Sequence, residues 1–390
     1  MIKTRFTLWL ALLLSSHVYA DTLRVATFNV SMEANNYVSD NAPAASGNLL
    51  LAHLQTGNHP QIRNIAEIIQ RVAPDIIVLN EFDYYPDASP SALSLFVSNY
   101  LRVSQQDQTA IDFPYQYIAP VNTGVATPFD LDNNGEKTGN AGDALGWGMY
   151  PGQYGMALLS RYPIRFEEIR TFQRFLWRDM PDRQQVTDPA TGADWFTDEE
   201  LGVVRLSSKS HWDIPVEVNG NIVHILAMHP TPPSFDGPED RNGKRNHDEI
   251  RMMADYITPG KAEYLYDDNG QRGGLTGGRF ILAGDFNAAD IGAKHRPGVI
   301  EQLTAHPRVN NSVLPLSEGG AESDNASFSN RYTAYWGARA DYVLPSVEGF
   351  KVTAAGVFWP ASSSPLYRLV KDRQSSSDHR LVWIDLSITE

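Results

Sequence analysis

The chain has 390 residues, no cysteine and a formal net charge of −14 with histidines neutral. The lack of cysteine excludes a disulfide framework and a thiolate zinc site. The acidity argues against broad electrostatic attraction to nucleic acid or anionic lipid, and it suits a protein that holds divalent cations.

The first twenty residues have the pattern of a secretory signal peptide. Lys3 and Arg5 precede an apolar run over 6–14, and the stretch ends in the small-residue pattern Val18, Tyr19, Ala20. Its removal takes the net charge from −14 to −16 because two cations leave. The run is too short to span a bilayer, and no later stretch approaches the roughly 20 apolar residues that a span needs. We therefore expect a secreted or periplasmic protein that has no transmembrane segment and is a monomer.

Short apolar runs with β-branched residues recur along the rest of the chain and predict strands, several of them buried on both faces. These runs cover 23–30, 75–79, 154–160, 222–228, 280–283, 341–344 and 381–388. Helical spacing of apolar residues predicts helices over 60–73, 91–103 and 246–257. No repeat or low-complexity linker divides the chain. The pattern predicts an α+β class with a sheet-centred core in a single catalytic domain over 21–390.

A Gly-, Asn- and Asp-rich insertion at about 120–153 interrupts this rhythm. Long loops in compact domains are usually functional, ligand-stabilised or disordered. Inside it, DLDNNG at 130–135 matches the first six positions of a calcium loop, but Ala141 stands where the bidentate Glu belongs. Structural Ca²⁺ and a plain polar turn both remain open. The candidate calcium ligands are Asp130, Asp132, Asn134, Glu136 and Asp143.

Polar side chains stand at the ends of the predicted strands. These residues are Asn29, Glu81, His229, Asp285, Asn287, Asp341, Asp378 and His379. Each alone is more often a turn former than a ligand, but together they supply both metal-binding oxygens and imidazoles. Hard divalent cations favour carboxylate and amide oxygens, so the candidate ligands are Asn29, Glu81, Asp285 and Asp378.

The same set contains the groups that hydrolysis of a phosphate ester requires. His379 beside Asp341 or Asp285 is the candidate base that activates water. His229 is a candidate donor to a phosphoryl oxygen or to the leaving group. Asn287 would offset charge on the phosphoryl oxygens.

Several of these residues lie in motifs that resemble the endonuclease/exonuclease/phosphatase superfamily, which includes deoxyribonuclease I. The motifs are ATFNV (26–30), DIIVLNE (75–81), YGMALLSRYPI (154–164), MHPTPP (228–233), GDFNA (284–288), ADYVL (340–344) and SDH (377–379). The resemblance spans nearly the whole mature chain. It implies a four-layer α/β/β/α sandwich of two packed mixed sheets flanked by helices, with the site at one end of the sheets.

The resemblance also implies roles for the strand-end residues. Glu81 would be the main Mg²⁺ ligand, with Mn²⁺ or Ca²⁺ as alternatives, and Asn29 would orient phosphate and metal. Asp285 and Asn287 would position water and phosphate, whereas Asp341, Asp378 and His379 would form the metal and base group. One departure is Asn80, which stands where the family usually has Gln.

A basic segment after the fourth of these motifs offers candidate ligands for a substrate phosphate, namely Arg241, Arg245 and His247. The alternative is a solvated loop whose cations pair with neighbouring acids. The favoured function is a secreted, divalent-metal-dependent phosphoesterase acting on small phosphodiesters or phosphomonoesters. The alternatives are a secreted nuclease, for which nucleic acid is only a substrate, a sphingomyelinase-like phosphodiesterase, and a calcium-stabilised binding protein without catalysis.

Overall fold

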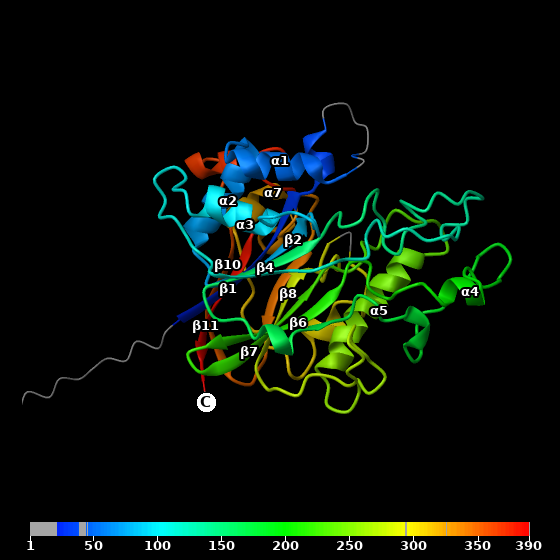
Figure 1. Ribbon diagram of the computed structural model, residues 1–390. Coiled ribbons are helices and arrows are strands. Elements are labelled where there is room, and N and C mark those ends of the chain that lie inside the picture. The colour runs from blue at the N-terminus through cyan, green and yellow to red at the C-terminus, as the bar shows by residue number, and fades with distance from the viewer. Residues whose placement is uncertain (1–21, 39–43, 45, 293–294, 325, 390) are drawn as a thin grey trace, which may run out of the picture.

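Two mixed β-sheets packed face to face form the centre of the molecule (Figure 1). The computed structural model describes residues 22–38, 44, 46–292, 295–324 and 326–389, so the expected signal peptide lies outside the described part. The six-stranded sheet has the order β10-β11-β1-β2-β4-β3 and the five-stranded sheet the order β5-β6-β7-β8-β9. The strands are β1 (Thr22–Met32), β2 (Ile76–Phe82), β3 (Tyr115–Ile118), β4 (Met156–Ser160), β5 (Arg170–Thr171), β6 (His211–Val218), β7 (Asn221–Met228), β8 (Phe280–Asp285), β9 (Asp341–Pro345), β10 (Phe350–Val357) and β11 (Val382–Ile388).

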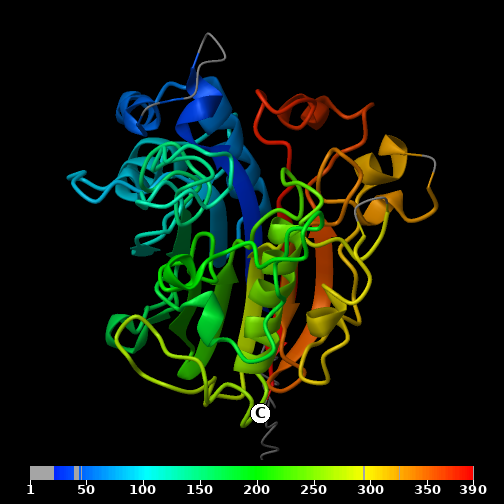
Figure 2. The same cartoon turned by 90° about the vertical axis from the view of Figure 1, so that its right-hand side faces the viewer.

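The helices lie outside the two sheets. The α-helices are α1 (Asn48–Thr56), α2 (Pro60–Val72), α3 (Ala92–Phe96), α4 (Asp198–Leu201), α5 (Arg241–Tyr256), α6 (Glu301–Thr304) and α7 (Glu318–Ser323). A π-helix, η2 (Val97–Leu101), continues α3, and single 3₁₀ turns are η1 (Ala34–Tyr37), η3 (Phe166–Glu168), η4 (Trp177–Asp179), η5 (Ser329–Arg331) and η6 (Pro365–Leu369). Figure 2 shows α5 in front of the strands of the five-stranded sheet.

Helix α2 illustrates how local sequence produces an outer layer. Pro60 occupies the first turn, where its missing N–H costs nothing, and Ile62, Ile65 and Ile69 are fully buried at helical spacing. The helix ends at Ala73, which adopts a left-handed conformation with φ 51° and donates its N–H to the Ile69 carbonyl. The helix expected over 60–73 is confirmed.

Alternation along β8 shows the layer order. Ile281 and Ala283 belong to the core between the two sheets, whereas Phe280 and Leu282 pack into a second core with α5 residues such as Met253. Because successive side chains of a strand point to opposite faces, β8 is covered on one face by the other sheet and on the other by α5. The four-layer α/β/β/α sandwich is therefore confirmed.

All seven expected strands are present, and four others were not expected from the sequence. Strand β6 carries Pro215 and Asp213, and β10 is an edge strand with several exposed residues, so neither forms an apolar run. Helix α5 begins at Arg241 rather than at 246. The apolar spacing did not reveal its first turn, because that turn is polar and contains Gly243. No helix in the described part of the chain is long and apolar enough to cross a bilayer.

The insertion links the antiparallel neighbours β3 and β4. It contains none of the named helices or strands and folds back on itself through isolated bridges between Thr123 and Gly146 and between Ala141 and Gly148. The insertion is thus an ordered loop at the same end of the sandwich as the polar ends of the strands.

Candidate active site

Strand register brings the polar strand ends together. Asn29 of β1 pairs in register with Asn80 of the parallel strand β2, and Asp285 at the end of β8 pairs with Asp341 at the start of the antiparallel strand β9. Asn29 Nδ2 donates to Asp285 Oδ2 across the two sheets, at 3.1 Å. Residues far apart in the sequence therefore converge at one end of the sandwich.

Asp285 Oδ2 is the centre of this group. Besides the Asn29 amide, Nε2 of His229 lies 3.5 Å away and Nε2 of His379 lies 3.6 Å away. The other carboxylate oxygen, Oδ1, accepts the backbone N–H of Asn287 at 2.9 Å. The carboxylate thus lies between the two imidazoles, and the backbone fixes its orientation.

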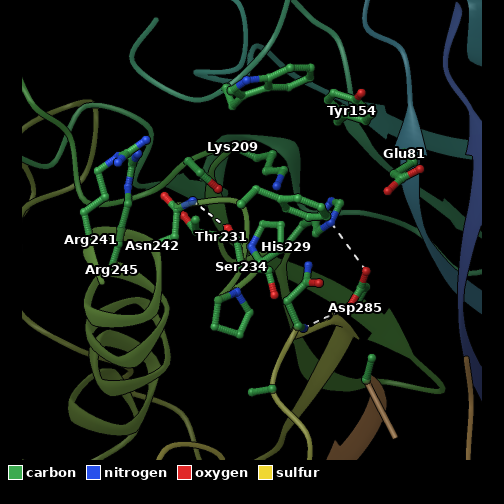
Figure 3. A pocket seen from close by; sticks show the side chains of 18 of the residues that line it. Glu81, Tyr154, Lys209, His229, Thr231, Ser234, Arg241, Asn242, Arg245 and Asp285 are labelled. Carbon is green, nitrogen blue, oxygen red and sulfur yellow. Dashed lines mark hydrogen bonds and ion pairs between the residues drawn. The ribbon is translucent and has the colours of Figure 1, made fainter. Parts of the chain in front are cut away.

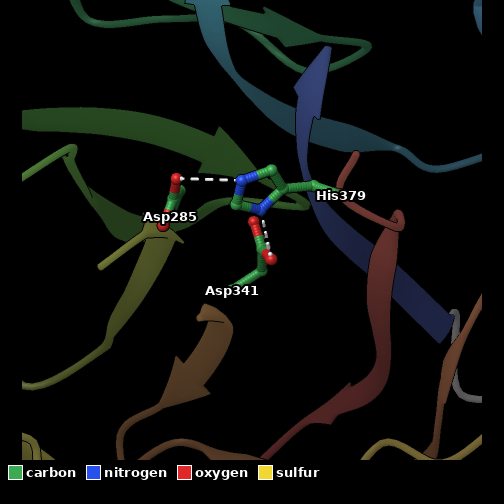
Figure 4. Close-up of side chains that lie close together, drawn as sticks. All are labelled: Asp285, Asp341 and His379. Carbon is green, nitrogen blue, oxygen red and sulfur yellow. Dashed lines mark hydrogen bonds and ion pairs between the residues drawn. The ribbon is translucent and has the colours of Figure 1, made fainter. Parts of the chain in front are cut away.

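His379 is held by a second carboxylate (Figure 4). Its Nδ1 lies 2.9 Å from Asp341 Oδ2, and that oxygen also accepts the Thr333 hydroxyl at 2.7 Å. Burial alone would lower the pKa of His379, but the charges of Asp341 and Asp285 raise it to about 10. Burial raises the pKa of Asp341 to about 6, against the opposing effect of His379. The pair therefore favours imidazolium beside carboxylate at neutral pH.

His229 follows β7 and has the opposite tendency. Its side chain is buried, and its Nδ1 has no hydrogen-bond partner among the described residues. Burial lowers its pKa well below the usual range, and the positive charges of Lys209 and His379 add to this effect. His229 is therefore a neutral imidazole whose N–H can donate a hydrogen bond but which resists taking up a proton.

Glu81 and Asp378 form a separate acidic pair at the end of β2 and before β11. Arg373 lies between them, 3.9 Å from Glu81 Oε2 and 3.5 Å from Asp378 Oδ2. Asp378 Oδ1 accepts the Ser31 hydroxyl at 2.9 Å, whereas the buried Glu81 Oε2 has no hydrogen-bond partner among the described residues. Burial, followed by repulsion from Asp378, raises the pKa of Glu81 to about 7.

Asn29 and Asn80 mainly join the sheets. Asn29 uses its amide N–H on Asp285, and its amide oxygen accepts the Ser31 backbone N–H at 3.1 Å. Asn80 accepts the backbone N–H of Asp285 at 3.0 Å and donates to the Met228 carbonyl at 3.2 Å. The shorter amide at position 80 is therefore a link between β2 and the strands β7 and β8, which explains how Asn serves where the sequence resemblance led us to expect Gln.

A cavity of about 710 Å³ opens beside these groups (Figure 3). Its wall includes Glu81, His229, Asp285, Asn287, Asp378 and His379. The insertion contributes Leu131, Gly142, Ala144, Leu145 and Trp147. The predicted insertion therefore forms part of the wall of the site, and the cavity has the size of a small-molecule site.

The basic residues of α5 occupy three different environments. The Arg245 guanidinium donates to the carbonyls of Leu206, Leu145 and Arg205 at 2.7–2.8 Å, so it anchors backbone although it borders the cavity. His247 pairs with Asp248 at 2.9 Å and is not among the residues that line the cavity. Arg241 does line the cavity, pairs with Glu239 and packs 5.5 Å from the Trp195 ring. Of the three candidate phosphate ligands, Arg241 and Arg245 line the cavity and His247 does not, and Arg245 uses Nε and Nη2 on carbonyl groups.

Three of the five predicted calcium ligands lie close together in the insertion. Oxygens of Asp130, Asp132 and Asp143 lie within 4.8 Å of one another. Asp143 accepts the backbone N–H groups of Leu131 and Thr138, whereas Asn134 accepts the backbone N–H of Glu136. Glu136 is not among the acids of this cluster, and Asn134 lies beside it, with its backbone N–H donating to Asp130 and Asp132.

The family model for the endonuclease/exonuclease/phosphatase family matches residues 26–379. The chain belongs to this family. Its members are metal-dependent hydrolases of phosphoric esters, and this chain is therefore such a hydrolase. Among proteins with curated functions, no sequence matches the chain.

Several solved structures have similar folds at low sequence identity. An endonuclease/exonuclease/phosphatase from Beutenbergia cavernae DSM 12333 shares 17% identity over 94% of this chain and 72% of its own, with a TM-score of 0.49. The catalytic domain of human Nocturnin shares 14% sequence identity over 94% of this chain and 95% of its own, with a TM-score of 0.43. Beta toxin from Staphylococcus aureus, as a mutant with bound magnesium ions, shares 12% sequence identity over 95% of this chain and 100% of its own, with a TM-score of 0.43.

The residues present fit the divalent cation that the family uses. Glu81 Oε2 is a buried oxygen without a hydrogen-bond partner among the described residues, and its carboxylate shares the Arg373 guanidinium with Asp378. Two carboxylates that share one guanidinium keep a net negative charge, which a divalent cation would offset. Asp285, Asp341 and His379 form a second group whose ligand atoms lie within 4.8 Å of one another.

Several residues of the site were not found from the sequence. Lys209, Arg373, Tyr335 and Trp336 all line the cavity. Trp336 packs edge-on against His379, with ring centroids 4.7 Å apart. The only signal for Lys209 was the polar stretch SSKS directly before β6, whereas the others lie in irregular loops without a recognisable motif.

Proposed function

We propose that this enzyme hydrolyses small phosphodiesters or phosphomonoesters with Mg²⁺, or with Mn²⁺ or Ca²⁺ in its place. The observation that carries the proposal is the position of His379 and Asp285 at the wall of a cavity of about 710 Å³, with Asp341 holding the His379 ring from behind. We also propose that the protein is exported, on the basis of residues 1–20, and acts as a monomer.

In the proposed reaction, water attacks phosphorus and the bond from phosphorus to the ester oxygen breaks. Asp341 fixes the His379 ring through Nδ1, which leaves Nε2 directed towards Asp285 as the acceptor of the water proton. Neutral His229 and the Asn287 amide donate hydrogen bonds to phosphoryl oxygens. A divalent cation held by Glu81 and Asp378 would supply Lewis-acid charge to a phosphoryl oxygen and, as a positive neighbour, lower the pKa of His379.

The form of the cavity favours a small ester with an organic substituent. Four exposed aromatic residues line it, namely Trp147, Phe235, Tyr335 and Trp336. Such side chains offer apolar area to a substituent at low entropic cost. The mature chain is strongly acidic, and this disfavours a long polyanion.

A nuclease is the second candidate, because Arg241 and the rim aromatics could bind one nucleotide of a strand. A sphingomyelinase-like phosphodiesterase is the third. Both alternatives would use the same catalytic groups as a hydrolase of small esters, and they differ from it in the size of the substrate.

A hydrolysis panel tests the proposal. The purified protein is given a chromogenic phosphomonoester, a chromogenic phosphodiester, a sphingomyelin analogue and plasmid DNA, each with Mg²⁺ and with chelator. We expect chelator-sensitive turnover of the small esters. Turnover of DNA alone would select the nuclease, and turnover of the sphingomyelin analogue alone would select the phospholipid diesterase. A folded Asp285→Asn variant that hydrolyses as fast as the parent would overturn the site assignment.

A structural Ca²⁺ in the insertion, held by Asp130, Asp132 and Asp143, is a separate proposal. It would add a cation to three carboxylates that lie close together. The insertion lines the cavity, so the ion would stabilise part of the substrate site without taking part in the chemistry.

A further inference from the structure

Lys209 is a buried cation without an internal partner. Its residue is only 6% exposed, and its ammonium has no hydrogen-bond or ion-pair partner among the described residues. The side chain lines the cavity beside His229 (Figure 3). A cation that lines a cavity and has no partner of its own among the described residues is available to an anion that enters the cavity.

The nearest carboxylates do not meet this need. Glu249, Glu81 and Asp285 act on Lys209 through space, but within the described chain none of them forms an ion pair with its ammonium. Glu249 uses its two oxygens on the backbone N–H groups of Ser208 and Thr231, at 2.8 and 2.6 Å. Burial lowers the pKa of Lys209, and the three carboxylates oppose this effect.

Several hydrogen bonds fix the backbone around Lys209. The carbonyl of Lys209 accepts the backbone N–H of Asn122 at 3.0 Å, and the Asn122 amide donates to the Ser207 carbonyl at 2.7 Å. From α5, Arg245 holds the carbonyl of Leu206 and Glu249 holds the N–H of Ser208. The lysine therefore starts from a fixed position, as a group that acts on a substrate requires.

The charge balance of the cavity calls for a cation at this place. Glu81, Asp285 and Asp378 all line it, and a phosphate ester that enters must approach these carboxylates. A fixed ammonium offsets the repulsion and is most effective where water is excluded. Arg245 is less suited to this role because Nε and Nη2 of its guanidinium already donate to carbonyl groups.

We propose that Lys209 is a further catalytic residue, whose ammonium binds a non-bridging oxygen of the phosphoryl group that is attacked. This inference rests on the proposed function, since the anion is the phosphoryl group of the ester substrate. The lysine neutralises charge on that oxygen in the ester and more strongly as charge develops during attack. It exchanges no proton and forms no covalent bond.

Three variants test the role: Lys209→Met, Lys209→Gln and, as a matched control, Lys261→Met at an exposed position away from the cavity. We expect Lys209→Met and Lys209→Gln to lower kcat/KM for the small esters roughly 100- to 1,000-fold, the range for loss of one donor to a developing oxyanion. Their melting temperatures should lie close to or above that of the parent, because the ammonium makes no hydrogen bond or ion pair with the described residues that the substitution could remove. Lys261→Met should match the parent in both measurements.

A second measurement does not depend on turnover. With chelator present, inorganic phosphate should raise the melting temperature of the parent and of Lys261→Met, but not that of Lys209→Met. Parent-like kcat/KM in Lys209→Met, or a melting temperature several degrees below the parent, would overturn the inference, the latter by showing an internal structural role. If the parent hydrolyses no ester in the panel, the proposed function fails, while the phosphate-dependent melting still decides whether Lys209 binds phosphate.

Discussion

Asn29 Nδ2 donates to Asp285 Oδ2 at 3.1 Å and so connects β1 of one sheet to β8 of the other. Asn80 makes a parallel connection through its hydrogen bonds to Asp285 and Met228. The contact between the two sheets at this end is therefore polar, although the centre of the sandwich is apolar. The same amides that close the sandwich also orient the carboxylate at the centre of the site.

Replacement of Asn80 tests this structural role. The side chain is fully buried, and Asn80→Ala leaves the Asp285 N–H and the Met228 carbonyl without their partner. Each unsatisfied buried group costs about 1–3 kcal/mol. We expect Asn80→Ala to lower the free energy of unfolding by about 2–5 kcal/mol in urea titrations. Asn269→Ala, at an exposed turn, is the control and should change it little. An unfolding midpoint equal to the parent's would contradict the bridging role.

The pairing of Asp341 with His379 should control kcat. Asp341→Asn keeps the shape but removes the charge that fixes and stabilises the imidazolium, whose Nδ1 lies 2.9 Å from the carboxylate. We expect kcat to fall by about 100- to 10,000-fold, the usual contribution of a positioned acid or base. Steady-state kinetics with a chromogenic ester measures the change. Asp107→Asn, in an exposed loop, serves as the matched control, and a similar loss in both variants would argue against a specific role for Asp341.

Loss of Glu81 should weaken metal binding. Its Oε2 is buried and accepts no hydrogen bond within the described chain, and its only ion pair is the long contact with Arg373 at 3.9 Å, so Glu81→Gln should be tolerated by the metal-free fold. We expect the Mg²⁺ concentration for half-maximal activity to rise by roughly 10- to 100-fold or more. The increase in melting temperature that Mg²⁺ produces in the parent should disappear. An unchanged Mg²⁺ dependence would place the cation elsewhere, with the group of Asp285, Asp341 and His379 as the next candidate.

The burial of His211 should make the free energy of unfolding depend on pH. It is fully buried, its Nδ1 lies 2.7 Å from the Ser207 hydroxyl, and burial lowers its pKa to about 3. The unfolded chain takes up a proton near pH 6.5, whereas the folded chain does so only near pH 3. Between these values the unfolded state binds the extra proton, so stability falls as the pH is lowered, by about 1.4 kcal/mol per pH unit from this group.

Urea titrations at a series of pH values between 6.5 and 4 measure the slope. His211→Asn retains a polar atom near Ser207 and removes the titration, so its stability should depend less steeply on pH than that of the parent. Identical slopes would show that other groups carry the acid sensitivity.

The outer architecture follows from the sequence because it rests on local patterns. The apolar runs that became β1, β2 and β8 and the spacing of Ile62, Ile65 and Ile69 carry enough information to place a layer. Strand-end residues such as Asp285 and His379 could be assigned to one site because motifs in a known order accompany them. Lys209 and Trp336 could not be assigned in this way, since their importance depends on which loops meet at the cavity. The carbonyl groups from two distant segments that bind the Arg245 guanidinium could not be foreseen for a related reason.

The calcium proposal for the insertion is tested by comparing two carboxylates of one cluster. Asp143 accepts the backbone N–H groups of Leu131 and Thr138, so Asp143→Ala should lower the melting temperature whether or not Ca²⁺ is present. Burial and the nearby charge of Asp143 raise the pKa of Asp132, which accepts one long backbone hydrogen bond of 3.3 Å. Its carboxylate therefore contributes little to the fold without a cation.

Asp132→Ala should consequently lower the melting temperature in Ca²⁺ but leave it nearly unchanged in chelator. Differential scanning calorimetry of both variants in both conditions gives four shifts to compare. Since Leu145 and Trp147 of the insertion line the cavity, loss of the ion should also raise KM for the small esters more than it lowers kcat. Equal shifts of Asp132→Ala in Ca²⁺ and in chelator would mean that hydrogen bonds alone hold the loop, and the insertion would then be a polar turn structure that forms one wall of the site.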